Sequence, residues 1–265
     1  MRFSIITVAF NPGASLRETA ESVLSQSYEN WEMIVKDGGS TDGSENTLPA
    51  DSRIRYIREK DHGIYDAMNA ALPHITGDYV LFLNCGDRLY ETETLAKIVE
   101  AVEADGRKHE IYFGDVFIRS RKGYVRYPDK IDTYFLMTRS ICHQSMVFAR
   151  QVTDVCRYDG ETYRYAADLD YYVQAVMRHQ AALKHLPFVV ADYEGGGTSE
   201  TAAHKKKILD EKDQIMRTYL SPESYRGIKR KKRLTGKALK EAVSCHPLLI
   251  GPYEKLAALL IRKKN

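Results

Sequence analysis

Three short acidic motifs have residue types and spacings that could carry chemistry. Asp37 begins D-G-G-S-T-D-G-S, Asp87 ends N-C-G-D after the apolar run V-L-F-L, and Asp168 and Asp170 lie in A-D-L-D-Y-Y. A carboxylate can accept a hydrogen bond from an amide, supply an oxygen ligand to Mg²⁺ or Mn²⁺, or take a proton from a hydroxyl. These motifs are therefore the first candidates for a site.

The motif at Asp37 fits a nucleotide base. It follows a predicted strand over 31–36, and two glycines come next, the second of which is Gly39. Glycines let the backbone approach a flat ligand closely, and a carboxylate at the strand end can accept from an N–H of a base. An Asx turn, with Asp42 or Ser44 capping the next segment, explains the same residues.

The motif at residues 84–87 resembles a degraded D-x-D, the acidic pair with which many nucleotide-sugar enzymes hold Mg²⁺ or Mn²⁺ against a diphosphate. Such a metal prefers oxygen ligands and shares one or two carboxylates with substrate phosphates. Asp87 can supply one carboxylate, whereas Asn84 offers only a neutral oxygen. A plain turn could use the same residue types.

The paired aspartates fit a general base. Asp168 and Asp170 stand at the start of an apolar helix predicted over about 169–178. Carboxylates two positions apart point in different directions, so one can face a cleft while the other caps the helix. The facing carboxylate could take a proton from an acceptor hydroxyl. A doubled N-cap is the alternative interpretation.

Histidine and cysteine give weaker signals. His143-Gln144 precedes the strand-like S-M-V-F-A, and a lone histidine beside a strand is more often structural than catalytic, so we expect a secondary role. The four cysteines lie far apart and form no C-x-x-C pair. This spacing favours free thiols over a disulfide framework or a zinc site.

Alternating strands and helices must position these motifs. The pattern predicts strands over 3–10, 31–36, 54–57 and 79–83, with helices over 16–26, 64–72 and 92–104. Ser15 and Glu18 have the spacing of a capping box for the first helix. Such alternation is typical of a parallel α/β sheet, which binds ligands at the carboxyl ends of its strands.

Shorter strands and aromatic loops follow residue 110. Strands are predicted over 111–117, 123–127, 145–149 and 186–193, followed by the loop E-G-G-G-T-S and a helix over 204–220. We interpret this part as a mixed-sheet extension that carries the second substrate. The predicted domains are a catalytic domain over 1–203, with a nucleotide-binding half over 1–110 and an acceptor half over 111–203, and a basic helical extension over 204–265.

Composition excludes fibrous and disordered proteins. Hydrophobic residues make up 43% and charged residues 28% of the 265 residues, which is ordinary for a globular chain. The first apolar run reaches Asn11 and Pro12 too early for a signal peptide, and no run approaches the ~18 residues of a membrane span. We therefore expect a soluble, cytoplasmic protein.

Charge is distributed unevenly along the chain. Residues 204–265 hold 17 of the 39 Lys and Arg residues but 6 of the 36 Asp and Glu residues, although the whole chain carries only +3. A basic, partly apolar segment over 226–265 suits an anionic membrane surface. The alternative is that this tail packs on the catalytic domain with its charges solvated. No aromatic platform accompanies the basic run, so nucleic acid is not an expected partner.

Taken together, the motifs resemble the inverting family 2 glycosyltransferases of GT-A fold. The matching pieces cover about residues 3–200 in the family's order, namely S-I-I-T-V-A-F-N, V-L-S-Q-S-Y-E-N-W-E-M-I-V-K-D-G-G-S-T-D-G-S, D-H-G-I-Y-D-A-M-N-A-A-L, G-D-Y-V-L-F-L-N-C-G-D, H-Q-S and A-D-L-D-Y-Y. The pieces look most like the bacterial subgroup that builds capsular, colanic-acid-type or lipopolysaccharide repeat units. The resemblance implies a Rossmann-like, mixed but mainly parallel sheet flanked by helices.

The resemblance also implies roles for particular residues. It places Thr7, Val8, Phe10, Asp37 and Gly39 around the nucleotide, Asp66, Asn69 and Asn84 near the donor, Asp87 at a Mg²⁺ or Mn²⁺ ion on the diphosphate, and Asp168, in preference to Asp170, as the base. The implied reaction moves a sugar with inversion from a nucleotide-sugar to a glycan or lipid-linked acceptor, in cell-surface polysaccharide synthesis at the inner face of the plasma membrane.

Two other functions could use a similar sheet. A sugar nucleotidyltransferase needs a Gly-rich loop with Lys or Arg after the first strand, and A-F-N-P-G-A-S contains neither basic residue. A non-catalytic nucleotide-sugar-binding or scaffold protein would tolerate the missing first carboxylate of the D-x-D motif. The retained Asp168 argues against that alternative.

Overall fold

The computed structural model describes residues 1–196 and 204–236, with side chains described as far as residue 233. Internal contacts divide the chain into two units, Met1–Ile215 and Met216–Asn265. The predicted boundary after residue 203 stays a prediction. Among the described helices, none is both long and apolar enough to cross a membrane.

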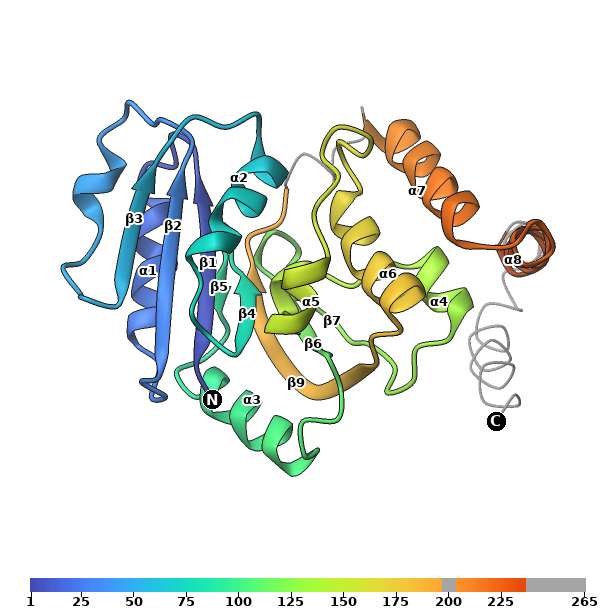
Figure 1. The fold of residues 1–265 in the computed structure, drawn as a ribbon, viewed down its shortest axis with the longest axis horizontal. Helices are drawn as coiled ribbons and strands as arrows, with labels where there is room; N and C mark the ends of the chain where they lie inside the picture. Colours follow the sequence, from blue (N-terminus) through green and yellow to red (C-terminus); the bar gives the residue numbers. More distant parts are fainter. Residues whose placement is uncertain (197–203, 237–265) are drawn as a thin grey trace. The chain divides into compact units, whose positions relative to one another are not determined.

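One mixed sheet organises the first unit (Figure 1). Its strands are β1 (Phe3–Ala9), β2 (Trp31–Asp37), β3 (Ile54–Arg58), β4 (Tyr79–Phe82), β5 (Arg88–Leu89), β6 (Ile111–Ile118), β7 (Gly123–Val125), β8 (Met146–Ala149) and β9 (Leu183–Tyr193). Within the described residues the order is β3-β2-β1-β4-β8-β6-β9-β5, with β7 beside β6. The sheet is mainly parallel because β3, β2, β1 and β4 run together and the longest later pairing, β6 with β9, is also parallel.

Helices cover both faces of the sheet. The described helices that begin in the first unit are α1 (Ser15–Leu24), α2 (Ile64–Ala71), α3 (Thr94–Ala104), α4 (Thr133–Thr138), α5 (Arg150–Val155), α6 (Ala167–His179) and α7 (Lys205–Tyr219). The second unit contains α8 (Pro222–Gly236). α1 and α3 bury Leu16, Val23 and Ile98 against alternate strand residues such as Ile5 and Met33. α2 packs on the opposite face, over β1 and β2 (Figure 1). The predicted α/β class is confirmed.

One strand at the middle of the sheet, β8, runs opposite to both of its neighbours. β8 pairs antiparallel with β4, and β6 pairs antiparallel with β8. The first four strands therefore present one set of carboxyl ends, and the elements after residue 110 form a wall beside them. This arrangement brings the β4 end close to residues 140–168. The strands predicted to be shorter after residue 110 include β6 and β9, which have 8 and 11 residues and are the longest of the described strands, so that expectation is wrong for these two.

The predicted capping box of α1 is wrong. α1 begins at Ser15, its N-cap is Ala14 in helical conformation, and no side chain caps it. The backbone turns earlier, at Gly13 with φ +57°, which places Ser15 inside the first turn. Glu18 instead pairs with Arg88 at 2.5 Å, so it links α1 to β5.

The helix that carries Asp168 is tied to α7. Glu211 of α7 accepts hydrogen bonds from the backbone N–H groups of Arg164, Tyr165 and Ala166 at 3.1, 2.8 and 2.9 Å. These groups lie directly before α6. A carboxylate at this position satisfies donors at the helix N-terminus and complements its partial positive charge.

Candidate active site

A cavity of ≈ 1360 Å³ lies beside the carboxyl end of β4. Its lining comes from the start of α2, the turn at residues 84–87, β6 and β7, and the segments 140–144, 157–168 and 193–195. The cavity collects Asp66, Asn69, Asn84, Asp87 and Asp168 from distant parts of the sequence. The other predicted site residues do not line this cavity, namely Thr7, Val8, Phe10, Asp37 and Gly39.

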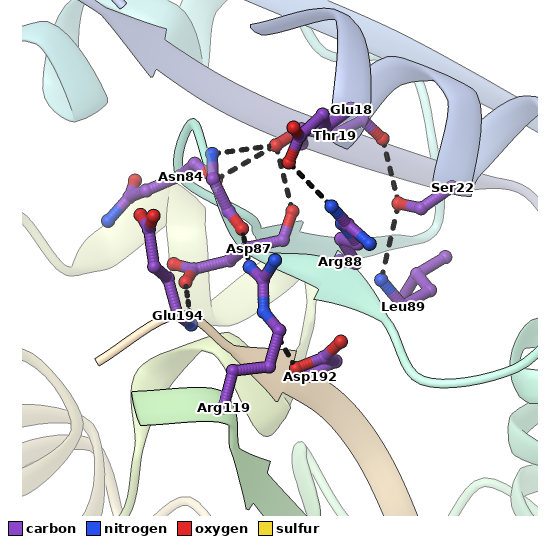
Figure 2. Close-up of polar contacts among 11 residues, drawn as sticks. Glu18, Thr19, Ser22, Asn84, Asp87, Arg88, Leu89, Arg119, Asp192 and Glu194 are labelled. Carbon is purple, nitrogen blue, oxygen red and sulfur yellow. Dashed lines mark hydrogen bonds and ion pairs between the residues drawn. The ribbon is translucent and has the colours of Figure 1, made fainter. Parts of the chain in front are cut away.

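The turn at residues 84–87, hereafter the tip, is fixed by side chains from other elements (Figure 2). The buried Thr19 hydroxyl of α1 donates to the Asp87 carbonyl at 2.8 Å and accepts from the Gly86 N–H at 2.9 Å. Arg119, which follows β6, donates to the Gly86 carbonyl. The tip is therefore a supported turn whose backbone polar groups are satisfied from two sides.

The Asp87 carboxylate is buried and held at both oxygens. Its Oδ1 accepts from the Glu194 N–H at 2.9 Å, and its Oδ2 accepts from Gln144 Nε2 at 2.8 Å. Burial raises the pKa of Asp87 to about 6, although these hydrogen bonds and nearby His143 oppose the rise. Within the described part of the chain no lysine or arginine forms an ion pair with Asp87, so this buried carboxylate is a favourable place for a cation to bind.

His143 connects the tip to the predicted base. Its Nε2 lies 3.2 Å from Asn84 Nδ2, and its Nδ1 lies 3.7 Å from Asp168 Oδ2. The Asn84 Oδ1 atom is buried and has no hydrogen-bond partner. His143 thus stands between an amide at the β4 end and a carboxylate on α6, all three of which line the same cavity.

The two candidate bases have different surroundings. α6 begins at Ala167, and Asp168 in its first turn lines the cavity with its side chain 26% exposed. Asp170 is 2% exposed and is not a lining residue. The helical spacing of about 100° per residue explains this separation, because residues two apart point to different sides. Only Asp168 of the pair is in position to meet a substrate in the cavity.

Asp37 lies at the end of β2 in a buried pocket of backbone amides. Its Oδ1 accepts from the N–H groups of Gly39 and Ser40 at 2.7 and 2.6 Å, and its Oδ2 is buried without a partner. Burial raises the pKa of Asp37, but the hydrogen bonds from Ser40 and Gly39 outweigh it and leave the pKa below its usual value. Asp37 is therefore an ionised, fully buried acceptor, and the Tyr56 hydroxyl also contributes to lowering its pKa.

The predicted base-contacting residues of β1 differ in exposure. The Thr7 hydroxyl donates to the Leu83 carbonyl at 2.7 Å, and Val8 is 7% exposed. Phe10 follows β1 and is 70% exposed, a high value for a large apolar side chain. An exposed ring at the carboxyl end of a central strand is available to pack on a flat ligand.

The predicted donor residues of α2 already have protein partners. Asp66 accepts from the His62 N–H at 2.9 Å. Asn69 accepts from the Tyr158 N–H at 2.9 Å and donates to the Tyr158 carbonyl at 2.8 Å. Asn69 therefore clamps α2 to the wall of the cavity, with both ends of its amide in use.

A divalent metal at the tip would need oxygen ligands from a substrate. Within the described residues, no group of three or more His, Cys, Asp or Glu side chains could hold a metal alone. The tip does supply the Asp87 carboxylate and the unpaired Asn84 amide oxygen. One carboxylate, a neutral oxygen and phosphate oxygens form a donor set that Mg²⁺ or Mn²⁺ accepts, so the residues fit a metal held jointly with a diphosphate.

Sequence reasoning missed several residues of the site. Gln144, Glu194, Thr19 and Arg119 hold the tip, and Glu194 comes 107 positions after Asp87. The placement of Gln144 directly after His143, and of Glu194 before the run of glycines, were the available signals. Neither signal shows which residue the side chain or backbone contacts, because these contacts form only in the tertiary fold.

The sequence matches the profile of glycosyl transferase family 2 over residues 4–153. A curated relative, the PGL/p-HBAD biosynthesis glycosyltransferase of Mycobacterium bovis (strain BCG / Pasteur 1173P2), is 32% identical over 211 residues, which are 77% of this chain and 81% of the relative. The alignment with this relative covers more of the chain than the family profile does.

Solved structures show the same fold. TarS of S. aureus superposes with a TM-score of 0.65 at 16% identity, over 93% of this chain and 46% of TarS, so the chain spans less than half of that protein. Mannosyltransferase PcManGT from Pyrobaculum calidifontis, solved with GDP-Man and Mn2+, superposes with a TM-score of 0.58 at 17% identity, over 97% of this chain and 83% of PcManGT. The predicted GT-A type of fold agrees with these likenesses.

Proposed function

The chain belongs to glycosyl transferase family 2, and we propose that it transfers a sugar with inversion from a nucleotide-sugar donor to a glycan or lipid-linked acceptor. The observation that carries this proposal is the meeting of the tip and Asp168 in one cavity, with His143 between them. One side of the cavity can hold a diphosphate and the other can activate a hydroxyl.

The nucleotide base would lie at the ends of β1 and β2. Asp37 places an ionised carboxylate at the end of β2, and a carboxylate at this position suits an imide or amide N–H of the base. The exposed Phe10 ring would cover the base, and the backbone at Gly39 would allow close approach. Both groups stand at strand ends, where α/β sheets bind nucleotides.

The diphosphate would lie against the tip. Asp87 and the Asn84 amide oxygen would hold Mg²⁺ or Mn²⁺ together with phosphate oxygens, and the metal would supply positive charge where the leaving group develops negative charge. Structures of similar fold carry related ligands, among them TarS with UDP-GlcNAc and PcManGT with GDP-Man and Mn2+. These likenesses support a nucleotide-sugar donor.

Asp168 would act as general base. It would take the proton of an acceptor hydroxyl while that oxygen forms a bond to the anomeric carbon and the bond from that carbon to the diphosphate breaks. Attack from the face opposite the diphosphate inverts the configuration. The partial exposure of Asp168 on the cavity wall leaves room for the acceptor hydroxyl.

Calorimetric titration of UDP, GDP and dTDP, each with and without Mn²⁺, tests the donor site. We expect metal-dependent binding of one nucleotide that disappears in Asp87→Ala and persists in Asp78→Ala, a control aspartate at the opposite end of β4. If none of the three nucleotides binds, the tip is an ordinary turn and the non-catalytic alternative takes precedence.

Asp168→Asn tests the base once the donor is known. The variant should bind the nucleotide as the wild type does and transfer sugar about 100- to 10,000-fold more slowly, the usual contribution of a general base. Full transfer activity in Asp168→Asn, with loss in Asp170→Asn, would move the role to Asp170.

We also propose that the basic helix α8 attaches the enzyme to an anionic membrane surface near a lipid-linked acceptor of cell-surface polysaccharide or glycolipid synthesis. Its basic side chains are exposed, namely those of Arg226, Lys229, Arg230, Lys231, Lys232 and Arg233. Each basic residue near an anionic surface contributes about 1 kcal/mol. The rest of the predicted membrane segment, residues 237–265, lies outside the described residues.

Sedimentation with anionic phosphatidylglycerol vesicles tests this attachment. Changing Arg226, Arg230 and Arg233 to glutamine removes about 3 kcal/mol of attraction, which should weaken binding by roughly 100-fold. A control changes three exposed lysines of the first unit, Lys108, Lys122 and Lys184, to glutamine. Equal binding of the two triple variants would contradict the proposal.

A further inference from the structure

His143 and Gln144 form a pair of neighbouring residues whose side chains contact two of the acidic motifs, the tip and the motif of Asp168. They lie in a short turn, His143–Ser145, directly before β8. His143 approaches Asn84 and Asp168, and Gln144 donates to Asp87. The exposed fraction of the His143 side chain is 13%, and Gln144 is 5% exposed. These contacts with Asn84, Asp168 and Asp87 indicate a role for the pair beyond packing.

The contact with Asp168 indicates which nitrogen of His143 carries the proton. A carboxylate only accepts, so Nδ1, which lies 3.7 Å from Asp168 Oδ2, is the ring nitrogen that bears the hydrogen. This separation is within reach of the charge but longer than a direct hydrogen bond. In a neutral imidazole the other nitrogen, Nε2, is then the acceptor, and it lies 3.2 Å from Asn84 Nδ2.

The acceptor at Nε2 then determines the orientation of the Asn84 amide, because only the amide nitrogen can donate to it. With Nδ2 directed at His143, the Oδ1 atom must point the other way, and it is the atom that is buried without a partner. A flipped amide would direct Oδ1 at His143 and withdraw the oxygen from the tip. His143 therefore selects the amide orientation in which Asn84 offers an acceptor.

Gln144 fixes the neighbouring carboxylate in the same manner. Its Nε2 donates to Asp87 Oδ2 at 2.8 Å, while its Oε1 accepts from the Cys142 thiol at 2.8 Å. Both ends of the Gln144 amide are in use, so the side chain is oriented by its two bonds as long as Asp87 is a carboxylate. The two oxygen-bearing groups of the tip are thus oriented by two consecutive residues.

We propose that His143 is a positioning residue that couples the two halves of the site, because it turns the Asn84 oxygen toward the metal-diphosphate and holds Asp168 by its opposite ring nitrogen. The inference rests on the proposed function, since it assigns a task to residues of that site. His143 neither touches the reacting atoms nor exchanges a proton with them. The Asn84 amide replaces the first carboxylate of a D-x-D motif and needs such orientation, which a symmetric carboxylate would not.

Two amide substitutions separate the two contacts of His143. The end of a glutamine side chain reaches the place of Nε2, whereas an asparagine reaches only the place of Nδ1. His143→Gln should keep the contact with Asn84 and lose the contact with Asp168. His143→Asn should do the reverse.

The readouts are Mn²⁺-supported nucleotide binding by calorimetry and kcat of sugar transfer. His143→Asn should weaken Mn²⁺-supported binding by about 10- to 100-fold, the usual effect of removing a partner that orients a metal ligand. His143→Gln should leave that binding unchanged and lower kcat by about 10-fold or more. His109→Gln, a histidine paired with Asp105 at 2.7 Å outside the cavity lining, is the control and should change neither readout.

Nitrogen-15 NMR of the histidine rings tests the wild-type protein directly. The metal-free protein should show His143 as the tautomer protonated at Nδ1. The tautomer protonated at Nε2, or two amide variants with identical binding and identical kcat, would overturn the inference. If the wild type binds no nucleotide, the proposed donor site fails instead, while the tautomer still decides how His143 orients Asn84.

Discussion

Substituting Asp87→Asn removes a buried negative charge and changes little of the shape of the side chain. The asparagine oxygen can still accept from the Glu194 N–H. Its Nδ2 would face Gln144, whose amide can rotate so that Oε1 accepts, at the cost of the weak bond from the Cys142 thiol. The variant therefore keeps the tip together and loses the charge.

The stability effect follows from the pKa of Asp87. Burial raises the pKa from 3.8 in the unfolded chain to about 6 in the folded protein, so the folded state binds the proton more tightly. The free energy of unfolding then falls as the pH rises from 3.8 toward 6, and it stays low above this window. At about 1.36 kcal/mol for each pKa unit, the loss in the wild type is about 3 kcal/mol.

Urea unfolding in a metal chelator, followed by the fluorescence of the single and buried Trp31, measures this effect. The free energy of unfolding of Asp87→Asn minus that of the wild type should rise by about 3 kcal/mol between pH 3 and pH 7 and then stay level. Titrating groups that do not interact with Asp87 cancel in this difference. Curves for the two proteins that stay parallel across the window would refute the assignment of a strained, buried charge at Asp87.

Three further substitutions or treatments test the support of the tip. Thr19→Val keeps the side-chain shape but removes the bonds to Gly86 and Asp87, so the free energy of unfolding should fall by about 1–3 kcal/mol in urea titrations, and no fall would contradict the role of the hydroxyl. Gly86→Ala should lower the melting temperature and weaken Mn²⁺-supported nucleotide binding. The reason is that Gly86 has φ +94° and an added Cβ would collide with the Glu194 carboxylate. An unchanged melting temperature in the variant would argue against this packing. Burial and the charge of Asp87 raise the pKa of the Cys85 thiol to about 12, so mass spectrometry should find Cys85 alkylated by iodoacetamide at pH 8 far more slowly in the folded than in the unfolded protein, and equal rates would count against it.

The sequence predicts most of the scaffold because its signals are local. β-branched and aromatic runs ending at Asp37 and Asn84 are strands in the structure, and the strand ends lie at one edge as parallel pairing requires. The start of α1 could not be predicted from residue types alone. It depends on the left-handed backbone at Gly13, which moves the helix start relative to Ser15.

The connections within the site are less predictable than its carboxylates. Asp87 and Asp168 stand out because a polar group follows or opens an apolar element. The partners of Asp87, Gln144 and Glu194, come from 57 and 107 positions away. His143 looks like an ordinary structural histidine until the fold places Asn84 on one side of its ring and Asp168 on the other.

The bonds from Glu211 have a practical consequence for where the chain can be cut. A protein shortened to residues 1–203 would contain every predicted site residue, yet it would leave three N–H groups before α6 without their acceptor. The helix that carries Asp168 would then begin from an unanchored segment. A truncated protein meant to separate catalysis from membrane attachment should therefore retain α7 through Tyr219 and end before α8.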